Sequence, residues 1–145
     1  MSKMTKGHSA RNNLTEWLSY LESIHAIEID LGLTRISAVA KKLNIDFSQS
    51  TVITVAGTNG KGTTCAFLEN ALLAKKLMCA VYSSPHIERF NERLRLNKVE
   101  VNDASLVKAF ETIEQTRDDI SLTYYEYTTL AALLILTAEQ PEVLI

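Results

Sequence analysis

The chain has 145 residues, of which 46% are apolar and 22% are charged, and its formal net charge is −2. This composition is typical of one globular domain with a substantial core. It contains no basic run of the kind that nucleic-acid backbones require, and no apolar run of the roughly 18 residues that a membrane span requires. We therefore expect neither a nucleic-acid partner nor a membrane partner.

Two helices are predicted before the first strand. Asn13 or Thr15 can cap a helix that continues to Ser23, since apolar residues follow at helical spacing. A second helix is predicted from Thr34, and Asn44 is a plausible end for it.

The segment from Thr51 to Val55 favours a buried strand, and it runs into a glycine-rich turn and a further helix, about 62–76. The residues of this helix that we expect to face the sheet are Ala66, Phe67, Ala71, Leu72 and Leu73. This order of elements predicts a phosphate-binding loop. Glycines allow several backbone N–H groups to face one anion, the helix adds its positive end, and Lys61 adds a full charge. A hydroxyl from Thr63 or Thr64 can reach the phosphate or its Mg²⁺.

The loop does not match the general pattern G-x-x-x-x-G-K-[ST]. Val55 stands at the first glycine position, and Gly62 follows the lysine where a hydroxyl residue is usual. The alternative reading is a strand-to-helix turn that binds no ligand.

A second buried strand is predicted at 78–82. Because strand, helix and strand imply a right-handed crossover, we expect the two strands to lie side by side with their carboxyl ends at one edge. Ligands bind at this edge of open α/β sheets. Ser83 and Ser84 follow the second strand, and they either ligate Mg²⁺ or simply form a turn.

The remaining elements complete an α/β domain. They are a short strand at 93–96, a helix from Asn102 or Asp103 to Arg117, a long apolar helix from near Tyr125 to Gln140, and a strand that begins at Val143. We predict a three-layer α/β fold with a mostly parallel sheet that contains a P-loop. The two cysteines, Cys65 and Cys79, form no metal-binding pattern, which favours buried thiols and a cytoplasmic protein.

Three tyrosines and a carboxylate stand where the long helix begins. Tyr124, Tyr125 and Tyr127 can stack on a flat heterocycle while Glu126 accepts a hydrogen bond from it. Equally, the tyrosines can pack under the helix.

Several motifs together resemble the folylpolyglutamate synthase/dihydrofolate synthase family, within the Mur-ligase-like group. They are AGTNGKGT at 56–63, YSSPH at 82–86, NER at 91–93, IDLGL at 29–33 and LTYYEY at 122–127. The glycine after the lysine, unusual for a general P-loop, is the residue that this family shows. The resemblance extends from about Trp17 to Ile145.

The resemblance implies a role for several residues. ATP phosphates would be held by Thr58, Asn59, Gly60 and Lys61, with Gly62 and Thr63 beside them, and Lys61 would also act in catalysis. Ser84 would ligate Mg²⁺. The pterin or folate would lie against Glu28, Ile29, Asp30, Leu31, Thr123, Tyr124, Tyr125 and Glu126.

The activity that the resemblance implies is ATP-dependent addition of L-glutamate to dihydropteroate, to folate polyglutamate tails, or to both, through an acyl phosphate. Residues 1–145 would form the N-terminal part of the ATP-binding domain of a protein that is monomeric at full length. The other metal ligands and a C-terminal domain would lie beyond Ile145, so the chain alone would be inactive. A related Mur-type ligase, a small-molecule kinase and a non-catalytic nucleotide-binding fragment remain alternatives.

Overall fold

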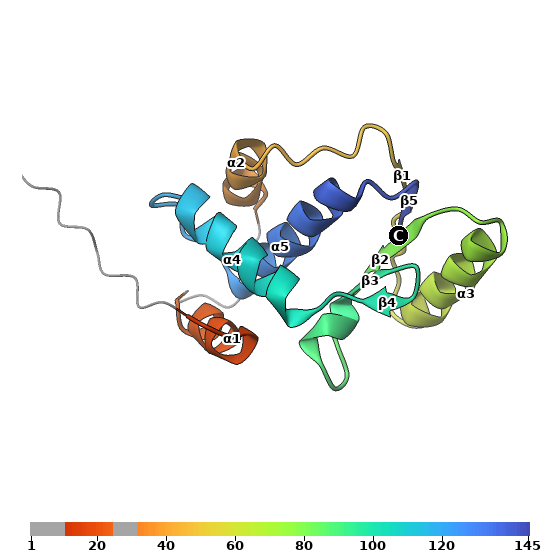
Figure 1. Ribbon diagram of the computed structural model, residues 1–145, viewed down its shortest axis with the longest axis horizontal. Coiled ribbons are helices and arrows are strands. Elements are labelled where there is room, and N and C mark those ends of the chain that lie inside the picture. Colours follow the sequence, from red (N-terminus) through yellow and green to blue (C-terminus); the bar gives the residue numbers. More distant parts are fainter. Residues whose placement is uncertain (1–10, 25–31) are drawn as a thin grey trace, which may run out of the picture.

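A computed structural model describes residues 11–24 and 32–145, and its strands form a sheet with helices on both faces (Figure 1). The helices are α1 (Leu14–Ser23), α2 (Thr34–Lys42), α3 (Lys61–Ala74), α4 (Asp103–Thr116) and α5 (Tyr124–Glu139), with a 3-10 turn η1 (Phe90–Arg93). The strands are β1 (Thr51–Val52), β2 (Cys79–Tyr82), β3 (Leu94–Leu96), β4 (Val99–Glu100) and β5 (Val143–Leu144). The three-layer α/β prediction is confirmed.

The helices begin and end close to the predicted residues because local capping signals are used. The Asn13 side chain accepts a hydrogen bond from the N–H of Glu16 at the start of α1, and Asn102 does the same for Ser105 in α4. At the other end of a helix, Asn44 after α2 and Gln140 after α5 have φ of 54° and 48°. This left-handed conformation stops a helix.

The five-stranded sheet has the order β1-β5-β2-β3-β4. Strands β1, β5 and β2 are parallel, and β3 and β4 form an antiparallel hairpin at one side. The prediction that the first two strands are neighbours is wrong, since β5 lies between them and pairs with both. Nothing near Val143 in the sequence indicates this order, because a parallel strand can insert wherever its two neighbours leave room.

Alternate residues of the central strands serve different layers. Cys79 and Val81 of β2 pack with Cys65 of α3 on one face, whereas Ala80 packs with Ala132 and Leu136 of α5 on the other. Figure 1 shows the same division, with α3 on one side of the sheet and α4 and α5 on the opposite side.

The buried face of α3 differs from the expected one. Its inward stripe is Cys65, Leu68, Glu69, Leu72 and Leu73, at spacings of three and four residues. Ala66, Phe67 and Ala71, which the sequence pattern assigns to the sheet-facing side, are exposed. The helix carries apolar residues on all sides, so hydrophobic periodicity alone does not identify its buried face.

Helix α5 is apolar on most sides because it packs against both the sheet and the outer helices. Its Tyr127 hydroxyl donates to Glu114 of α4 at 2.6 Å, and Tyr20 of α1 donates to the same carboxylate at 3.0 Å. Arg117 forms an ion pair with Glu114 at 2.8 Å. Burial, followed by the hydrogen bond to Glu114, raises the pKa of Tyr127, so this hydroxyl stays protonated.

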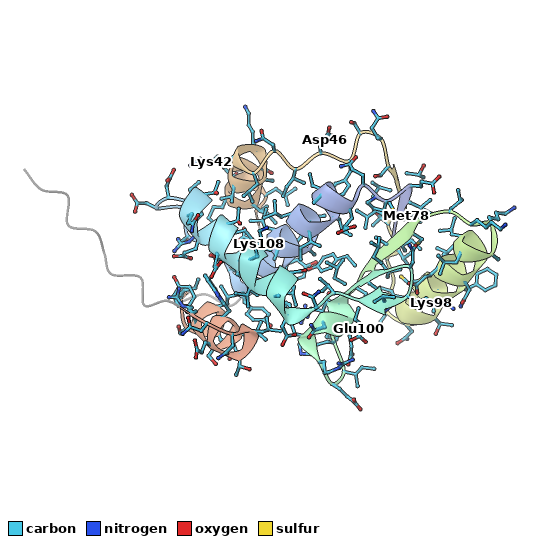
Figure 2. All side chains as sticks on the ribbon, in the orientation of Figure 1. Lys42, Asp46, Met78, Lys98, Glu100 and Lys108 are labelled. Carbon is cyan, nitrogen blue, oxygen red and sulfur yellow. The ribbon has the colours of Figure 1, made fainter. Side chains whose placement is uncertain are left out.

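Figure 2 labels side chains in different parts of the fold: Lys42 and Lys108 lie in helices α2 and α4, and Glu100 lies in strand β4. Met78 directly precedes β2, and Lys98 lies in the turn between β3 and β4. Within the described residues, no helix combines the length and the apolar character needed to cross a membrane.

Candidate active site

The candidate phosphate loop lies between β1 and α3. After β1 the chain still follows β5, since the N–H of Ile53 donates to the carbonyl of Leu144 at 2.8 Å. It then turns at Gly57 and Gly60, whose φ values are 152° and 78°. Residues that carry a side chain rarely adopt these φ values, so glycine at both positions permits the turn into the helix.

The loop and the first turn of α3 are open to solvent. Residues 56–64 are all exposed, which leaves their backbone accessible to a ligand. The first N–H groups of a helix have no intrahelical acceptor, and they carry the positive end of its dipole. Exposed N–H groups at the start of a helix suit a phosphate.

Lys61 is the first residue of α3, and its side chain folds back over the loop. Its Nζ donates to the carbonyl oxygen of Gly57 at 2.5 Å, so the ammonium group lies above the turn. The Thr64 hydroxyl is used internally, because it donates to the carbonyl of Gly60 at 3.0 Å. The exposed Thr63 is therefore the better placed of the two threonines to meet a ligand.

The residues predicted to hold phosphate lie together as one continuous surface. They are Thr58, Asn59, Gly60, Lys61, Gly62 and Thr63, all exposed around the start of α3. The arrangement can bind a polyanion and neutralise charge that develops on it.

Ser84 leaves the sheet at the same edge as the phosphate loop. Thr51 of β1 and Cys79 of β2 both pair with Val143, and Ala56 and Ser84 each lie five residues further along the chain, beyond the ends of these parallel strands. The strands are two sheet spacings apart, about 10 Å, because β5 lies between them. Figure 1 shows the start of α3 and the loop between β2 and β3 at the same, lower edge of the sheet.

Ser84 has an exposed side chain that could contribute one oxygen ligand to a metal ion. Throughout residues 11–24 and 32–145, no three His, Cys, Asp or Glu side chains gather closely enough to hold a metal. A Mg²⁺ ion at Ser84 would therefore need further ligands, such as phosphate or water oxygens.

The loop that carries Ser84, residues 83–93, is held closed by contacts between its own side chains and backbone groups. Arg93 donates from Nε to Nδ1 of His86 at 2.8 Å, and the N–H of Ser83 donates to the carbonyl of Arg93 at 2.9 Å. The Glu92 carboxylate accepts from the N–H groups of Ile87, Glu88 and Arg89. His86, which the sequence left without a role, is thus a partner of Arg93.

Thr123 and Glu126, predicted to contact substrate, form a capping box at the start of α5. The Thr123 hydroxyl accepts from the N–H of Glu126 at 3.1 Å, and the Glu126 carboxylate accepts from the N–H of Thr123 at 2.8 Å. Arg35 of α2 donates to both carboxylate oxygens at 3.1 Å. With only 3% and 5% of their surface exposed, Thr123 and Glu126 hold the helix start in place.

The tyrosines at this helix start differ in accessibility. Tyr125 is 54% exposed and Tyr124 is half-buried, so these two can reach a ligand, whereas Tyr127 is buried in the core. Tyr124 also lies near Arg93, whose guanidinium carbon is 6.0 Å from its ring centroid. Burial raises the pKa of Tyr124, and the nearby Arg93 partly opposes this shift.

The other predicted substrate segment, Glu28, Ile29, Asp30 and Leu31, lies outside the described residues. Arg35, four residues after it, is held by Glu126 at the start of α5. The start of α2 therefore lies beside the second predicted substrate segment.

Sequence reasoning missed the positioning contacts of this site. The spacing T-x-x-E at Thr123 and Glu126 is itself a capping-box signal and could have revealed their shared role. The contacts of Arg35 and Glu92 depend on the fold or on loop conformation, and no comparable signal precedes them.

Comparisons with curated proteins and with solved structures place the chain among known proteins, whereas no protein-family model matches it. It is 48% identical to the dihydrofolate synthase/folylpolyglutamate synthase of Escherichia coli (strain K12) over 136 residues, which cover 94% of this chain and 32% of that relative. It is 32% identical to the folylpolyglutamate synthase of Lacticaseibacillus casei over 124 residues, which cover 81% of this chain and 29% of that relative. The chain thus spans about a third of the length of the curated relatives it matches.

Solved structures of the same class of enzyme are also similar to this chain. E. coli FolC in complex with DHPP and ADP superposes with a TM-score of 0.88 at 48% identity, covering 92% of this chain and 32% of that one. The bifunctional Yersinia pestis enzyme complexed with AMPPNP and Mn gives 0.87 at 46% identity, covering 92% and 33%. Over the region that it spans, the chain belongs to the dihydrofolate synthase/folylpolyglutamate synthase family.

Proposed function

We propose that the full-length protein is an ATP-dependent ligase that joins L-glutamate to dihydropteroate, to the glutamate tail of folates, or to both. The observation that carries the proposal is the arrangement at one edge of the sheet. There, Lys61 folds back over an exposed glycine loop, and Ser84 follows β2 at the same edge. The names of the relatives and the DHPP, ADP, AMPPNP and Mn bound in the similar structures support it.

The chemistry follows from the poor electrophilicity of a carboxylate. The substrate carboxylate attacks the γ-phosphate of ATP, ADP leaves, and an acyl phosphate forms. The amino group of glutamate then attacks the acyl carbon, the amide forms and phosphate leaves. No side chain of this chain acts as a nucleophile in this scheme.

The chain contributes mainly positioning and charge. The backbone N–H groups from Thr58 to Thr63 would orient the phosphates, and Lys61 would neutralise charge on the transferring phosphoryl group. Lys61 would exchange its contact with the Gly57 carbonyl for the phosphates. Ser84 would help to hold Mg²⁺, which supplies further charge neutralisation at the phosphates when bound.

The substrate would lie between the two predicted substrate segments. Tyr125 and Tyr124 are placed to stack on a pterin ring, while Thr123 and Glu126 fix the helix start that presents them. We include Glu28, Ile29, Asp30 and Leu31 in this proposal because Arg35, in the next helix α2, forms an ion pair with Glu126.

The rest of the active centre, including further metal ligands and the glutamate site, would come from regions outside this chain. We place the protein in the cytoplasm as a monomer, and its two free, buried cysteines, Cys65 and Cys79, suit a reducing compartment.

Substrate-dependent release of ADP tests the proposal. The full-length protein is expected to release ADP only when ATP, Mg²⁺, glutamate and either dihydropteroate or a folate are all present. The 145-residue chain alone is expected to release none above background. ADP release with an unrelated carboxylate and not with a pterin would identify another ligase or a kinase, and no release in any mixture would leave only a binding module.

A further inference from the structure

The loop that carries Ser84 contains an anion-binding turn that is already occupied by the chain itself. Three consecutive backbone N–H groups, those of Ile87, Glu88 and Arg89, converge on the Glu92 carboxylate at 2.8, 3.0 and 2.8 Å. Consecutive N–H groups of this kind form a concave site for a negative charge. Here the Glu92 side chain fills the site and ties the outer part of the loop to its end.

The residues around Glu92 are anchored to the rest of the fold. Phe90 is buried in the main helical core, and Asn91 donates from Nδ2 to the carbonyl of Val101 and to the Asp103 carboxylate, both at 2.8 Å. Glu92 lies within the 3-10 turn η1 directly before β3. The carboxylate therefore connects the projecting residues 87–89 to a fixed support.

The opposite end of the loop is fixed by separate contacts. Ser83 bonds to the carbonyl of Arg93, and His86 accepts from the Arg93 side chain. Ser84 lies between these fixed points, with an exposed side chain. Loss of the Glu92 contacts would release three N–H groups at once and free the segment that follows Ser84 and His86.

We propose that Glu92 is a positioning residue for metal binding, and that it acts by fixing the loop that presents Ser84. This inference rests on the proposed role of Ser84 in the function above. Glu92 itself makes no contact with the metal in this account. Residues that orient metal ligands typically change metal affinity by about 10- to 100-fold when they are removed.

The chain offers a closely matched control in Glu88. Glu88 is in the same loop, carries the same charge and has an exposed side chain, and among the described residues only its backbone N–H is bonded, to Glu92. Glu88→Gln and Glu92→Gln remove the same charge near Ser84. Only the second disturbs the carboxylate that receives the three N–H groups.

The test compares Mn²⁺ affinity in the full-length protein and four variants, Ser84→Ala, Glu92→Gln, Glu92→Ala and Glu88→Gln. Free Mn²⁺ is measured by electron paramagnetic resonance in the presence of AMPPNP. We expect Glu92→Ala to weaken Mn²⁺ binding about tenfold and Glu92→Gln to weaken it less, while Glu88→Gln has no effect. AMPPNP binding without metal is expected to stay unchanged, which a general loss of structure would not allow.

Hydrogen exchange provides a second, local measurement. The amides of residues 87–89 are expected to exchange faster in Glu92→Ala than in the parent protein, whereas amides of β2 keep their rates. If Ser84→Ala weakens Mn²⁺ binding but Glu92→Ala leaves it unchanged, the positioning role of Glu92 is overturned and the proposed function is unaffected. Unchanged affinity in Ser84→Ala would overturn the metal assignment and the inference together, and equal losses in Glu88→Gln and Glu92→Gln would show a charge effect in place of positioning.

Discussion

Lys61 is the single side chain on which the proposed chemistry depends most. It is exposed, and its only hydrogen bond among the described residues goes to the Gly57 carbonyl. Its charge is therefore available to a ligand and contributes little to the core. A residue of this kind should matter to catalysis far more than to folding.

Lys61→Ala in the full-length protein is expected to lower ligation at least a hundredfold, because it removes a charge that stabilises the transferring phosphoryl group. Its melting temperature should stay close to that of the parent, since exposed substitutions usually change stability by no more than about 0.5 kcal/mol. Lys75→Ala, just after the opposite end of α3, is the control and should keep full activity. Normal steady-state turnover in Lys61→Ala would contradict the assignment of Lys61 to phosphoryl transfer.

Glu92 should titrate at unusually low pH. Its pKa lies below the ordinary value, first because the N–H of Ile87 donates to its carboxylate and then because those of Arg89 and Glu88 do, while His86 adds a smaller effect. The charged form is thus favoured in the folded loop. Its contribution to stability is complete above the unfolded pKa of about 4.3 and is lost as pH falls through the lower folded value.

We therefore predict a carboxyl titration midpoint for Glu92 below about 4.3, measured by NMR with ¹³C-labelled glutamate in the full-length protein. The amide shifts of residues 87–89 should follow the same midpoint, because those N–H groups donate to the titrating oxygens. A midpoint at or above the ordinary value would show that the carboxylate does not receive these bonds.

Among the elements, α3 is joined to strand β3 by a buried ion pair. Glu69 of α3, with 4% of its side chain exposed, meets Arg95 of β3 at 2.8 Å. This pair connects the helix that follows the phosphate loop to the strand that follows the Ser84 loop. Its removal should affect how the two loops are held together.

Glu69→Ala is expected to destabilise the protein by about 2–3 kcal/mol, because it leaves Arg95 unpaired in a mostly buried place. The estimate lies below the usual cost of breaking a buried pair since a quarter of the Arg95 side chain reaches solvent. Asp118→Ala, which removes an exposed pair with Lys42, should cost less than about 1 kcal/mol. Urea unfolding measures both, and equal effects would contradict the distinction between the two ion pairs.

Element prediction from the sequence succeeded where the signal was local. Caps at Asn13 and Asn102 and the left-handed stop at Asn44 are set by neighbouring residues, so the helix boundaries followed from the sequence. The inward side of α3 did not, because its buried charge depends on Arg95, which lies 26 residues later. From the sequence alone, a charged residue is expected on the surface, and only the fold reveals a distant partner that allows its burial.

At the scale of the whole molecule, the sequence predicted that the glycine loop and Ser84 lie at one edge of the sheet, but not how the strands are ordered. The edge follows from the direction of parallel strands, whereas β5 separates β1 from β2 and sets the distance between the loops. The turn from β1 through Gly57 and Gly60 into α3 was predictable because strand, glycines, lysine and helix are contiguous. The contacts of Arg35 with Glu126 join residues 91 positions apart and required the fold.

The central claim is that this site serves phosphoryl transfer to a substrate carboxylate. The most direct measurement uses dihydropteroate with ¹⁸O in its carboxylate, full-length protein, ATP, Mg²⁺ and glutamate, and analyses the released phosphate by mass spectrometry. Formation of an acyl phosphate predicts one ¹⁸O in each phosphate, because the carboxylate oxygen that attacks ATP leaves with the phosphorus. Amide product accompanied by unlabelled phosphate would contradict the account.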